Sequence, residues 1–229
     1  MANRLRWLGH SALLVDTGTH KILMDPFLNG NPTAAIKPDE AEAHFIIVSH
    51  GHGDHVGDTV DIAKRNESTV ITNFEISGWF KNKHGLTNLH GLQHGGGVNL
   101  EFGRVKLTQA WHGSQLPDGS DGGNPCGVIL YLPGDQKIYN AADTGLFGDM
   151  KLIGEEGIDL AILPIGDYFT MGPDDSIRAI KFIEPKKVLP IHYNTFPPIQ
   201  QDVNTWAERV KAETNAEPIV LKPGDWMDV

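Results

Sequence analysis

The most informative stretch of this 229-residue chain is Phe45-Ile-Ile-Val-Ser-His50-Gly-His52-Gly-Asp54-His55. Its first five residues show no polar alternation, which is typical of a strand buried on both faces. Residues i and i+2 of an extended segment point to the same side, so His50 and His52 can bind one ion together. Asp54 and His55 lie where the chain turns toward the next helix, and there they can reach a second ion.

Imidazole and carboxylate groups in this arrangement indicate a metal site. They suit zinc, manganese, iron or nickel. The intervening Gly51 and Gly53 are expected to relieve crowding and to allow unusual backbone angles. A surface loop that happens to be rich in histidine is the alternative interpretation. Four possible ligands directly after a buried strand favour the metal site.

The composition excludes several classes of protein. Hydrophobic residues make up 40% of the chain, which is too many for a disordered protein. No run approaches 18 apolar residues, so we expect no membrane span. The formal net charge of −10 argues against nucleic-acid binding, which needs a basic surface. The first residues lack the long apolar region of a signal peptide, and Cys126 is the one cysteine. We therefore expect a cytoplasmic protein.

Outside this segment, the pattern predicts many short elements, because 26 Gly and 14 Pro are spread along the chain. The expected helices cover residues 58–65, 75–83, 174–183 and 203–213. The other expected strands cover residues 4–8, 12–16, 21–24, 70–72, 98–102, 105–110, 127–132, 137–141, 159–163, 187–191 and 219–221. Residues 113–125 are expected to form a long loop. Two packed sheets with helices outside accommodate this order.

The motif H-x-H-x-D-H after an apolar strand resembles the metallo-β-lactamase superfamily, whose α/β fold is a four-layer αβ/βα sandwich. The remaining elements of that family match in order. They are Asp25 at the end of an early strand, His112 in Trp111-His-Gly-Ser114, Asp143 in Ala142-Asp-Thr-Gly145 and His192 in Pro190-Ile-His-Tyr-Asn194. The match covers nearly the whole chain, so a single domain is expected over residues 1–229.

More narrowly, the chain is similar to compact metal-dependent hydrolases related to ascorbate-6-phosphate lactonase. Five phrases carry this likeness. They are Trp7-Leu-Gly-His-Ser11, residues 50–58, Asp143-Thr-Gly-Leu-Phe147, Pro164-Ile-Gly-Asp167 with Phe169-Thr-Met-Gly172, and Pro190-Ile-His-Tyr-Asn-Thr-Phe196. The resemblance implies a hydrolase that acts on a small molecule.

The resemblance also implies two divalent metal ions. The first would be held by His50, His52 and His112, the second by Asp54, His55 and His192, and Asp143 would bridge them with a hydroxide. Zinc is the first expectation, with Mn²⁺, Fe²⁺ or Ni²⁺ as alternatives. Such a pair lowers the pKa of a shared water, so that hydroxide can attack a lactone, ester or phosphoester. The net positive charge of the centre would favour an anionic substrate.

Further residues are candidates for supporting roles. His10, in the turn Leu8-Gly-His-Ser11, is a candidate catalytic proton donor or a support for the ligands. Asp25 is expected to hydrogen-bond near the metal loop and not to bind the ion itself. His94 is expected to line the pocket, and Asn194 or Tyr193 to contact the substrate.

The chain departs from related sequences at two positions, and two alternative functions fit its residues. β-Lactamases of this superfamily carry Cys or Ser where this chain has Asp143, which argues against that activity. Asn140 stands where related sequences carry histidine. A nuclease or phosphodiesterase is one alternative function, although the acidic composition weighs against it. A non-hydrolytic metal-binding member is the other. The pattern leaves a homo-oligomer open.

Overall fold

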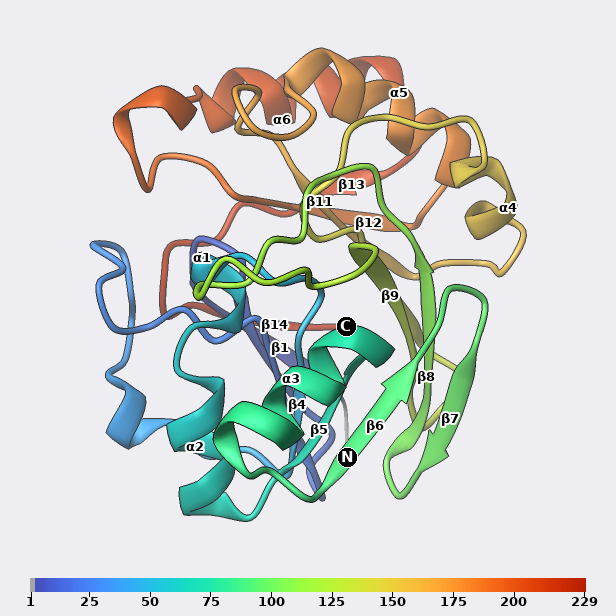
Figure 1. Ribbon diagram of the computed structural model, residues 1–229. Helices are drawn as coiled ribbons and strands as arrows, with labels where there is room; N and C mark the ends of the chain where they lie inside the picture. Colours follow the sequence, from blue (N-terminus) through green and yellow to red (C-terminus); the bar gives the residue numbers. More distant parts are fainter. Residues whose placement is uncertain (1–2) are drawn as a thin grey trace.

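Two seven-stranded sheets face one another in the computed structural model, which describes residues 3–229 (Figure 1). Helices cover the outer face of each sheet, so the predicted αβ/βα sandwich is confirmed. The first two residues of the predicted domain lie outside the described residues. Within residues 3–229, no helix is both long and apolar enough to cross a membrane.

The first sheet combines the N-terminal part of the chain with one C-terminal strand, in the order β14-β1-β2-β3-β4-β5-β6. Pairs from β14 to β3 are antiparallel, and pairs from β3 to β6 are parallel. The strands are β1 (Arg4–Gly9), β2 (Ala12–Asp16), β3 (Lys21–Met24), β4 (Phe45–Ile47), β5 (Thr69–Asn73), β6 (Leu89–Leu92) and β14 (Trp226–Asp228).

The second sheet repeats this pattern, in the order β13-β12-β11-β10-β9-β8-β7. Pairs from β7 to β10 are antiparallel, and pairs from β10 to β13 are parallel. The strands are β7 (Gly97–Leu100), β8 (Gly103–Gln109), β9 (Cys126–Tyr131), β10 (Lys137–Asn140), β11 (Leu160–Pro164), β12 (Lys187–Ile191) and β13 (Glu217–Pro218).

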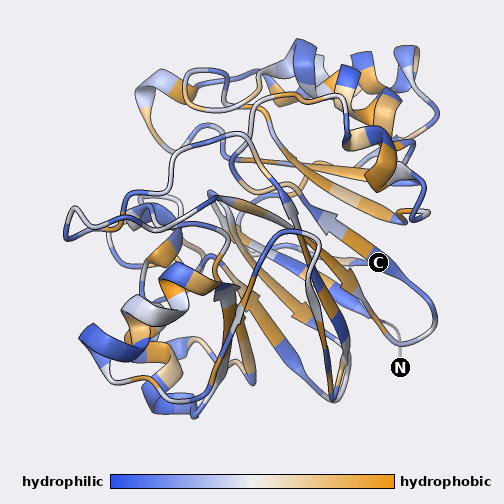
Figure 2. Cartoon of the chain, turned by 45° about the vertical axis from the view of Figure 1, so that its right-hand side comes forward, coloured by the Kyte–Doolittle hydropathy of each residue, from blue (hydrophilic) through white to orange (hydrophobic). Residues whose placement is uncertain are grey.

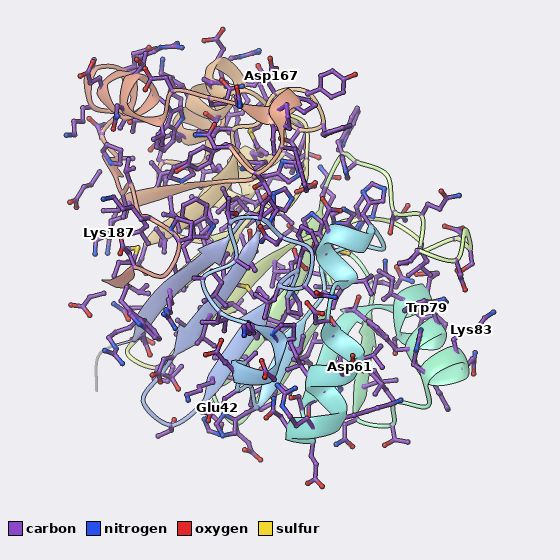
Figure 3. The ribbon with its side chains drawn as sticks, turned by 90° about the vertical axis from the view of Figure 1, so that its left-hand side faces the viewer. Glu42, Asp61, Trp79, Lys83, Asp167 and Lys187 are labelled. Carbon is purple, nitrogen blue, oxygen red and sulfur yellow. The ribbon has the colours of Figure 1, made fainter. Side chains whose placement is uncertain are left out.

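Six α-helices and two short 3-10 helices connect these strands within residues 3–229. Helices α2 and α3 lie by the first sheet, and α4, α5 and α6 by the second (Figure 1). Asp61 on α2 and Lys83 on α3 point away from the sheet (Figure 3). The helices are α1 (Gly53–Val56), α2 (Thr59–Asn66), α3 (Phe74–His84), α4 (Met150–Gly154), α5 (Pro173–Ile183), α6 (Val203–Glu213), η1 (Pro38–Glu40) and η2 (Pro197–Ile199).

The core has two parts, because successive side chains of a strand point to opposite faces. Leu13 and Val15 of β2 face the space between the sheets, whereas Leu14 faces the outer cluster with α2 and α3. Hydrophobic residues accordingly run along the strands of both sheets (Figure 2). Strand β4 contributes to both clusters and lies between β3 and β5, which confirms the predicted doubly buried strand.

The structure corrects some boundaries. Strand β4 ends at Ile47, two residues early, because the Ser49 N–H donates to the Asp25 carboxylate (2.8 Å) instead of to a neighbouring strand. The strand predicted at 219–221 is wrong. Pairing with β12 occurs at Glu217–Pro218, after which the chain leaves for the edge of the first sheet as β14. Strands β6 and β14 and the short helices α1 and α4 were not predicted.

Candidate metal centre

The polar residues singled out above follow the carboxyl ends of strands from both sheets. His10 follows β1, Asp25 follows β3, and the segment His50–His55 follows β4. His112, Asp143 and His192 follow β8, β10 and β12 in the second sheet. The backbone turns sharply at several of these points, with positive φ at His10 (55°), Asp25 (44°), Ala142 (50°) and His192 (54°). Such conformations cost energy for residues other than glycine and are concentrated at functional sites.

A first group of donors consists of His50, His52 and His112. One ring nitrogen from each lies within 4.8 Å of the other two. His50 Nε2 is 3.1 Å from His52 Nδ1, which is 3.2 Å from His112 Nε2. The chain bends over residues 50–52, with His52 itself in an extended conformation, and the loop after β8 brings His112 beside both rings. Three imidazole nitrogens that converge in this way suit a divalent transition metal.

A second group contains His10, Asp54, His55 and His192, again with one donor atom from each within 4.8 Å of the rest. Short helix α1 (Gly53–Val56) carries both Asp54 and His55 of this group. His10 was predicted as a catalytic proton donor or as a support for the ligands, and its position inside the group is a finding of the structure.

Asp143 lies between the two groups. Its Oδ2 is 3.0 Å from His192 Nε2 and 3.5 Å from His112 Nε2, and its Oδ1 is 3.3 Å from His55 Nε2. Both Asp143 Oδ1 and His55 Nε2 are buried, yet they do not align as a hydrogen bond and have no other partner among the described residues. Unpaired buried polar atoms are costly, so two that face one another fit a bound cation.

The electrostatics separate one charged pair from a set of neutral rings. Burial raises the pKa of Asp143, but His192 and His55 outweigh it, so this pKa lies well below its usual value. Burial lowers the pKa of His55, but Asp143 and Asp25 raise it well above its usual value. Burial and then the His55 charge keep the pKa of His50 well below its usual value. His50 thus keeps a lone pair available for a metal.

Asp25 supports His55 from behind. Its carboxylate accepts hydrogen bonds from the Ser49 N–H (2.8 Å), the Ser49 hydroxyl (2.6 Å) and His55 Nδ1 (2.9 Å). A bound metal ion would displace the Nε2 proton of the charged His55 and leave the proton on Nδ1 with Asp25, as in many metal sites. This geometry agrees with the expectation that Asp25 hydrogen-bonds beside the metal loop.

The two glycines of the motif differ. A Cβ atom on Gly51 would lie 2.5 Å from the carbonyl oxygen of Ser114, whose hydroxyl accepts a hydrogen bond from the Gly51 N–H (3.0 Å). Gly51 therefore relieves crowding against the loop of residues 113–125. A Cβ atom on Gly53 would meet nothing within 4 Å. Neither residue has a positive φ, so the expectation of unusual backbone angles is wrong for both.

Three further predicted residues lie around the cluster. His94 lines a pocket of ≈ 470 Å³ together with Trp111 and His112, and its Nε2 is 2.9 Å from the Pro125 carbonyl oxygen. Asn194 is exposed and uses both ends of its amide on Gln201, which gives it a contact within the loop.

Tyr193 is buried and stacks on Trp7, with ring centroids 5.5 Å apart. Burial raises the pKa of Tyr193 to about 12. These contacts favour structural roles for Asn194 and Tyr193 over contact with a substrate.

Sequence reasoning missed several residues beside the cluster. Ser49 contacts both Asp25 and the histidines, and Thr195 contacts His10. Both positions adjoin a recognised motif, which was the available signal.

An aromatic wall, made of Trp111, Tyr168 and Phe169, was also missed, and its side chains are 68%, 71% and 53% exposed. The N–H of Trp111 and that of Met171 bind Thr144, the residue after Asp143. Of the three rings, Trp111 is the one placed beside the cluster, because it lines the same pocket as His112.

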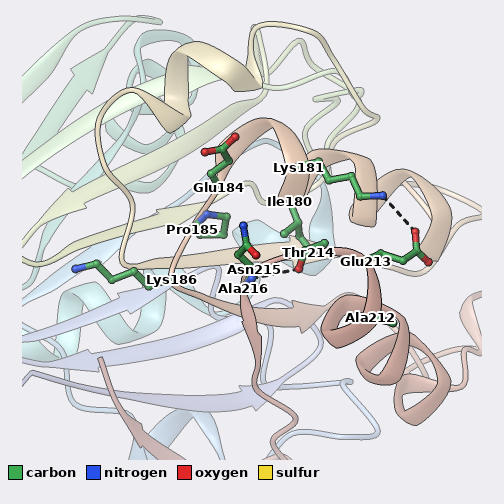
Figure 4. A pocket seen from close by; sticks show the side chains of 10 residues that line it. All are labelled: Ile180, Lys181, Glu184, Pro185, Lys186, Ala212, Glu213, Thr214, Asn215 and Ala216. Atoms are coloured by element: carbon green, nitrogen blue, oxygen red, sulfur yellow. Dashed lines mark hydrogen bonds and ion pairs between the residues drawn. The ribbon is translucent and has the colours of Figure 1, made fainter.

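Another pocket, of ≈ 660 Å³, lies between the C-terminal ends of α5 and α6 (Figure 4). Its polar features include an ion pair between Lys181 and Glu213 at 3.3 Å, and no histidine lines it. An exposed ion pair contributes little binding energy. The converging donors, and not this pocket, carry the chemistry of the molecule.

Comparisons with known proteins show the family of this chain. The family model described as "Beta-lactamase superfamily domain" matches residues 13–193. A UPF0173 metal-dependent hydrolase of Thermus thermophilus is 50% identical over 221 residues, covering 96% of each chain. Another, of Pelotomaculum thermopropionicum, is 45% identical and covers 99% of this chain and 100% of its own. Igni18, a metallo hydrolase of Ignicoccus hospitalis, has a solved structure with 32% identity and a TM-score of 0.90, covering 100% and 99% of the two chains.

Proposed function

This chain belongs to the metallo-β-lactamase superfamily and is a metal-dependent hydrolase, and from that premise we propose that it uses two metal ions to hydrolyse a small lactone, ester or phosphoester. The observation that carries the proposal is the position of Asp143. Its carboxylate lies within 3.5 Å of a histidine from each donor group, His112 and His192. A carboxylate in this position can serve two ions at once.

The donor groups define which residues would hold each ion. His50, His52 and His112 would hold the first, and Asp54, His55 and His192 the second, with Asp143 between them. When bound, two dications lower the pKa of a water between them and stabilise negative charge that develops on the attacked centre. Zinc is the metal we propose, and Mn²⁺, Fe²⁺ and Ni²⁺ suit the same donors.

The protein itself supplies orientation and charge. Asp25 holds the Nδ1 proton of His55, so that Nε2 stays available to the centre. Asp54 and Asp143 bring two negative charges against four positive ones, which leaves the centre positive. An anionic substrate group is therefore attracted there, although the whole chain carries −10.

The surroundings support a substrate with an apolar portion. Trp111 leads directly to His112, and its exposed ring lines a pocket together with that histidine. Rings in such a place bind apolar or aromatic groups by stacking and by removing them from water. We therefore propose a metabolite that combines a hydrolysable polar centre with an apolar portion.

The setting of the enzyme is also a proposal. We propose a cytoplasmic enzyme of small molecules, without nucleic-acid partners, because the chain is acidic and carries one cysteine. Salt-dependent binding of RNA or DNA would contradict this and favour a nuclease. The sequence leaves a homo-oligomer open, and light scattering in solution would test for one.

Elemental analysis of natively purified protein, together with a substrate panel, tests the proposed function. The panel contains lactones, carboxylic esters and bis-p-nitrophenyl phosphate. Asp143→Ala and His112→Ala should each lower activity by more than about 100-fold, since even residues that only support ligands cost 10- to 100-fold. His84→Gln is the control, because His84 packs on Trp79 of the same helix, α3. Full activity in metal-depleted Asp143→Ala protein would refute the proposal.

A further inference from the structure

We propose that Thr195 and His10 form a positioning pair that holds the Asp54 carboxylate at the second metal position. The inference rests on the proposed dinuclear function and deepens it. His10 follows β1 in the first sheet and Thr195 follows β12 in the second, 185 positions later in the chain. The pair therefore connects the two sheets directly behind the centre.

The contacts of the His10 ring form a continuous chain. Its Nδ1 is 2.8 Å from Thr195 Oγ1, and its Nε2 is 3.1 Å from Asp54 Oδ2. The His10 side chain is fully buried, whereas the Asp54 side chain is 31% exposed. Within the described residues, His10 is the one hydrogen-bond partner of the Asp54 carboxylate. Without this contact, Asp54 would be free to rotate toward solvent.

The chemistry of the three groups determines where the proton lies. A carboxylate can only accept hydrogen bonds, so His10 Nε2 must carry the proton that it shares with Asp54. In a neutral imidazole the other nitrogen then accepts, and the Thr195 hydroxyl donates to Nδ1. Thr195 thus selects the tautomer of His10 that donates to Asp54.

The opposite tautomer would make His10 a direct metal ligand through a bare Nε2. Nδ1 would then donate to Thr195, and the Thr195 hydroxyl would have to donate elsewhere. Its one alternative acceptor among the described residues is the Tyr193 carbonyl oxygen, 3.5 Å away, at the limit of a hydrogen bond. The short contact to His10 therefore favours the donating tautomer.

The surroundings hold the His10 ring in place. The His10 carbonyl oxygen accepts hydrogen bonds from Trp7 Nε1 (2.9 Å) and the His192 N–H (3.2 Å). Phe27 and Phe196 pack edge-on against the ring, with centroids 5.9 and 5.6 Å away. The backbone φ of +55° persists because these contacts determine it. A ring fixed in this way can orient a more exposed carboxylate.

Zinc binding to four variants tests the pair. Zinc per chain is measured after equilibration with graded concentrations of a chelator, which gives the affinity of each of two ions. Thr195→Val removes the hydroxyl at nearly constant shape, and the second zinc should bind about 10- to 100-fold more weakly, with the first unchanged. Thr195→Ser keeps the hydroxyl and should restore the affinity, which a loss of packing alone would not allow.

His10→Gln should also weaken the second zinc. Thr72→Val is the matched control, because Thr72 is fully buried on β5 and its hydroxyl has no hydrogen-bond partner among the described residues. It should bind both ions as the wild type does.

Two results would overturn the inference alone. In the first, the wild type binds two zinc ions and Thr195→Val binds the second zinc with the same affinity as the wild type. The other is a ¹⁵N NMR spectrum of the zinc-loaded protein in which His10 carries its proton on Nδ1, because that tautomer makes His10 a ligand. A wild type that binds a single zinc would instead refute the dinuclear function and the inference with it.

Discussion

Replacing Asp25 by asparagine should separate the support of a ligand from the stability of the fold. Asparagine keeps the shape of the side chain and tolerates the positive φ of this position (44°). Its carbonyl oxygen can still accept from the Ser49 N–H. Its NH₂ group then faces His55 Nδ1, which at present donates to Asp25 across 2.9 Å. Two donors cannot share that contact, so His55 should lose its Nδ1 proton and keep the proton on Nε2.

The cost follows from these contacts. One hydrogen bond to a charged group in a buried site is weakened, which amounts to about 1.5–3 kcal/mol in the free energy of unfolding. The substitution should also weaken metal binding, because a proton held on Nε2 occupies the lone pair of His55 that faces the centre. We expect the second ion to bind about 10- to 100-fold more weakly.

Urea unfolding of the metal-free protein and chelator competition with zinc measure the two effects. Asp58→Asn is the matched control, since the Asp58 carboxylate accepts hydrogen bonds from the Leu28 and Asn29 N–H groups (2.9 and 2.8 Å) and has no hydrogen bond to a histidine of the cluster. The control should lose some stability and keep its zinc affinity. The reasoning is refuted if Asp25→Asn binds both ions as tightly as the wild type.

Three more predictions concern the motif, the histidines and the aromatic wall. Gly51→Ala should destabilise the protein by about 1–3 kcal/mol in urea unfolding, because its Cβ would lie 2.5 Å from a backbone oxygen. A Cβ on Gly53 has open space, so Gly53→Ala should leave the stability unchanged or raise it. Equal effects of the two substitutions would contradict this prediction. The metal-free protein should lose stability on acidification from about pH 7 to about pH 5, because the unfolded chain takes up protons near the ordinary histidine pKa while burial keeps several pKa values lower in the folded protein. The histidines that act in this way are His10, His50, His52 and His112. His55 acts in the opposite direction, since its raised pKa stabilises the folded state at low pH and this contribution is lost only as the pH rises through that pKa. A urea midpoint that is equal or higher at about pH 5 than at about pH 7 would refute the predicted loss of stability. Trp111→Ala should raise KM about 10-fold for aryl substrates of the panel and leave the KM of small alkyl substrates unchanged. Trp226→Ala on β14 is the control. An equal change for both substrate classes would argue against binding of aryl groups by Trp111.

Much of the fold could be predicted because its signals are local. The run at β4 has no polar alternation, and the structure buries it between β3 and β5. The helices at residues 174–183 and 203–213 differ from α5 and α6 by at most one residue at either end. The elements that escaped prediction depend on distant partners. Strand β14 has three residues and exists because β1 offers an edge to pair with.

The donor residues were predictable for a related reason. The spacing of His50 and His52 alone places two rings on one side of the chain, and the resemblance supplied His112, Asp143 and His192. The supporting roles were not predictable to the same degree. Asn194 lies beside His192 in the sequence, but the left-handed turn there directs its amide to Gln201.

The sequence by itself therefore determined which residue types follow each strand, and with them the class of chemistry. Periodicity and residue spacing describe contacts over a few positions, and they identify the residue that follows each strand. Only the tertiary structure decided that His10 faces Asp54 with Thr195 behind it, and how far Asp143 lies from His112 and His192. Those contacts join strand ends from two different sheets, and their geometry depends on how the sheets pack, which no local pattern records.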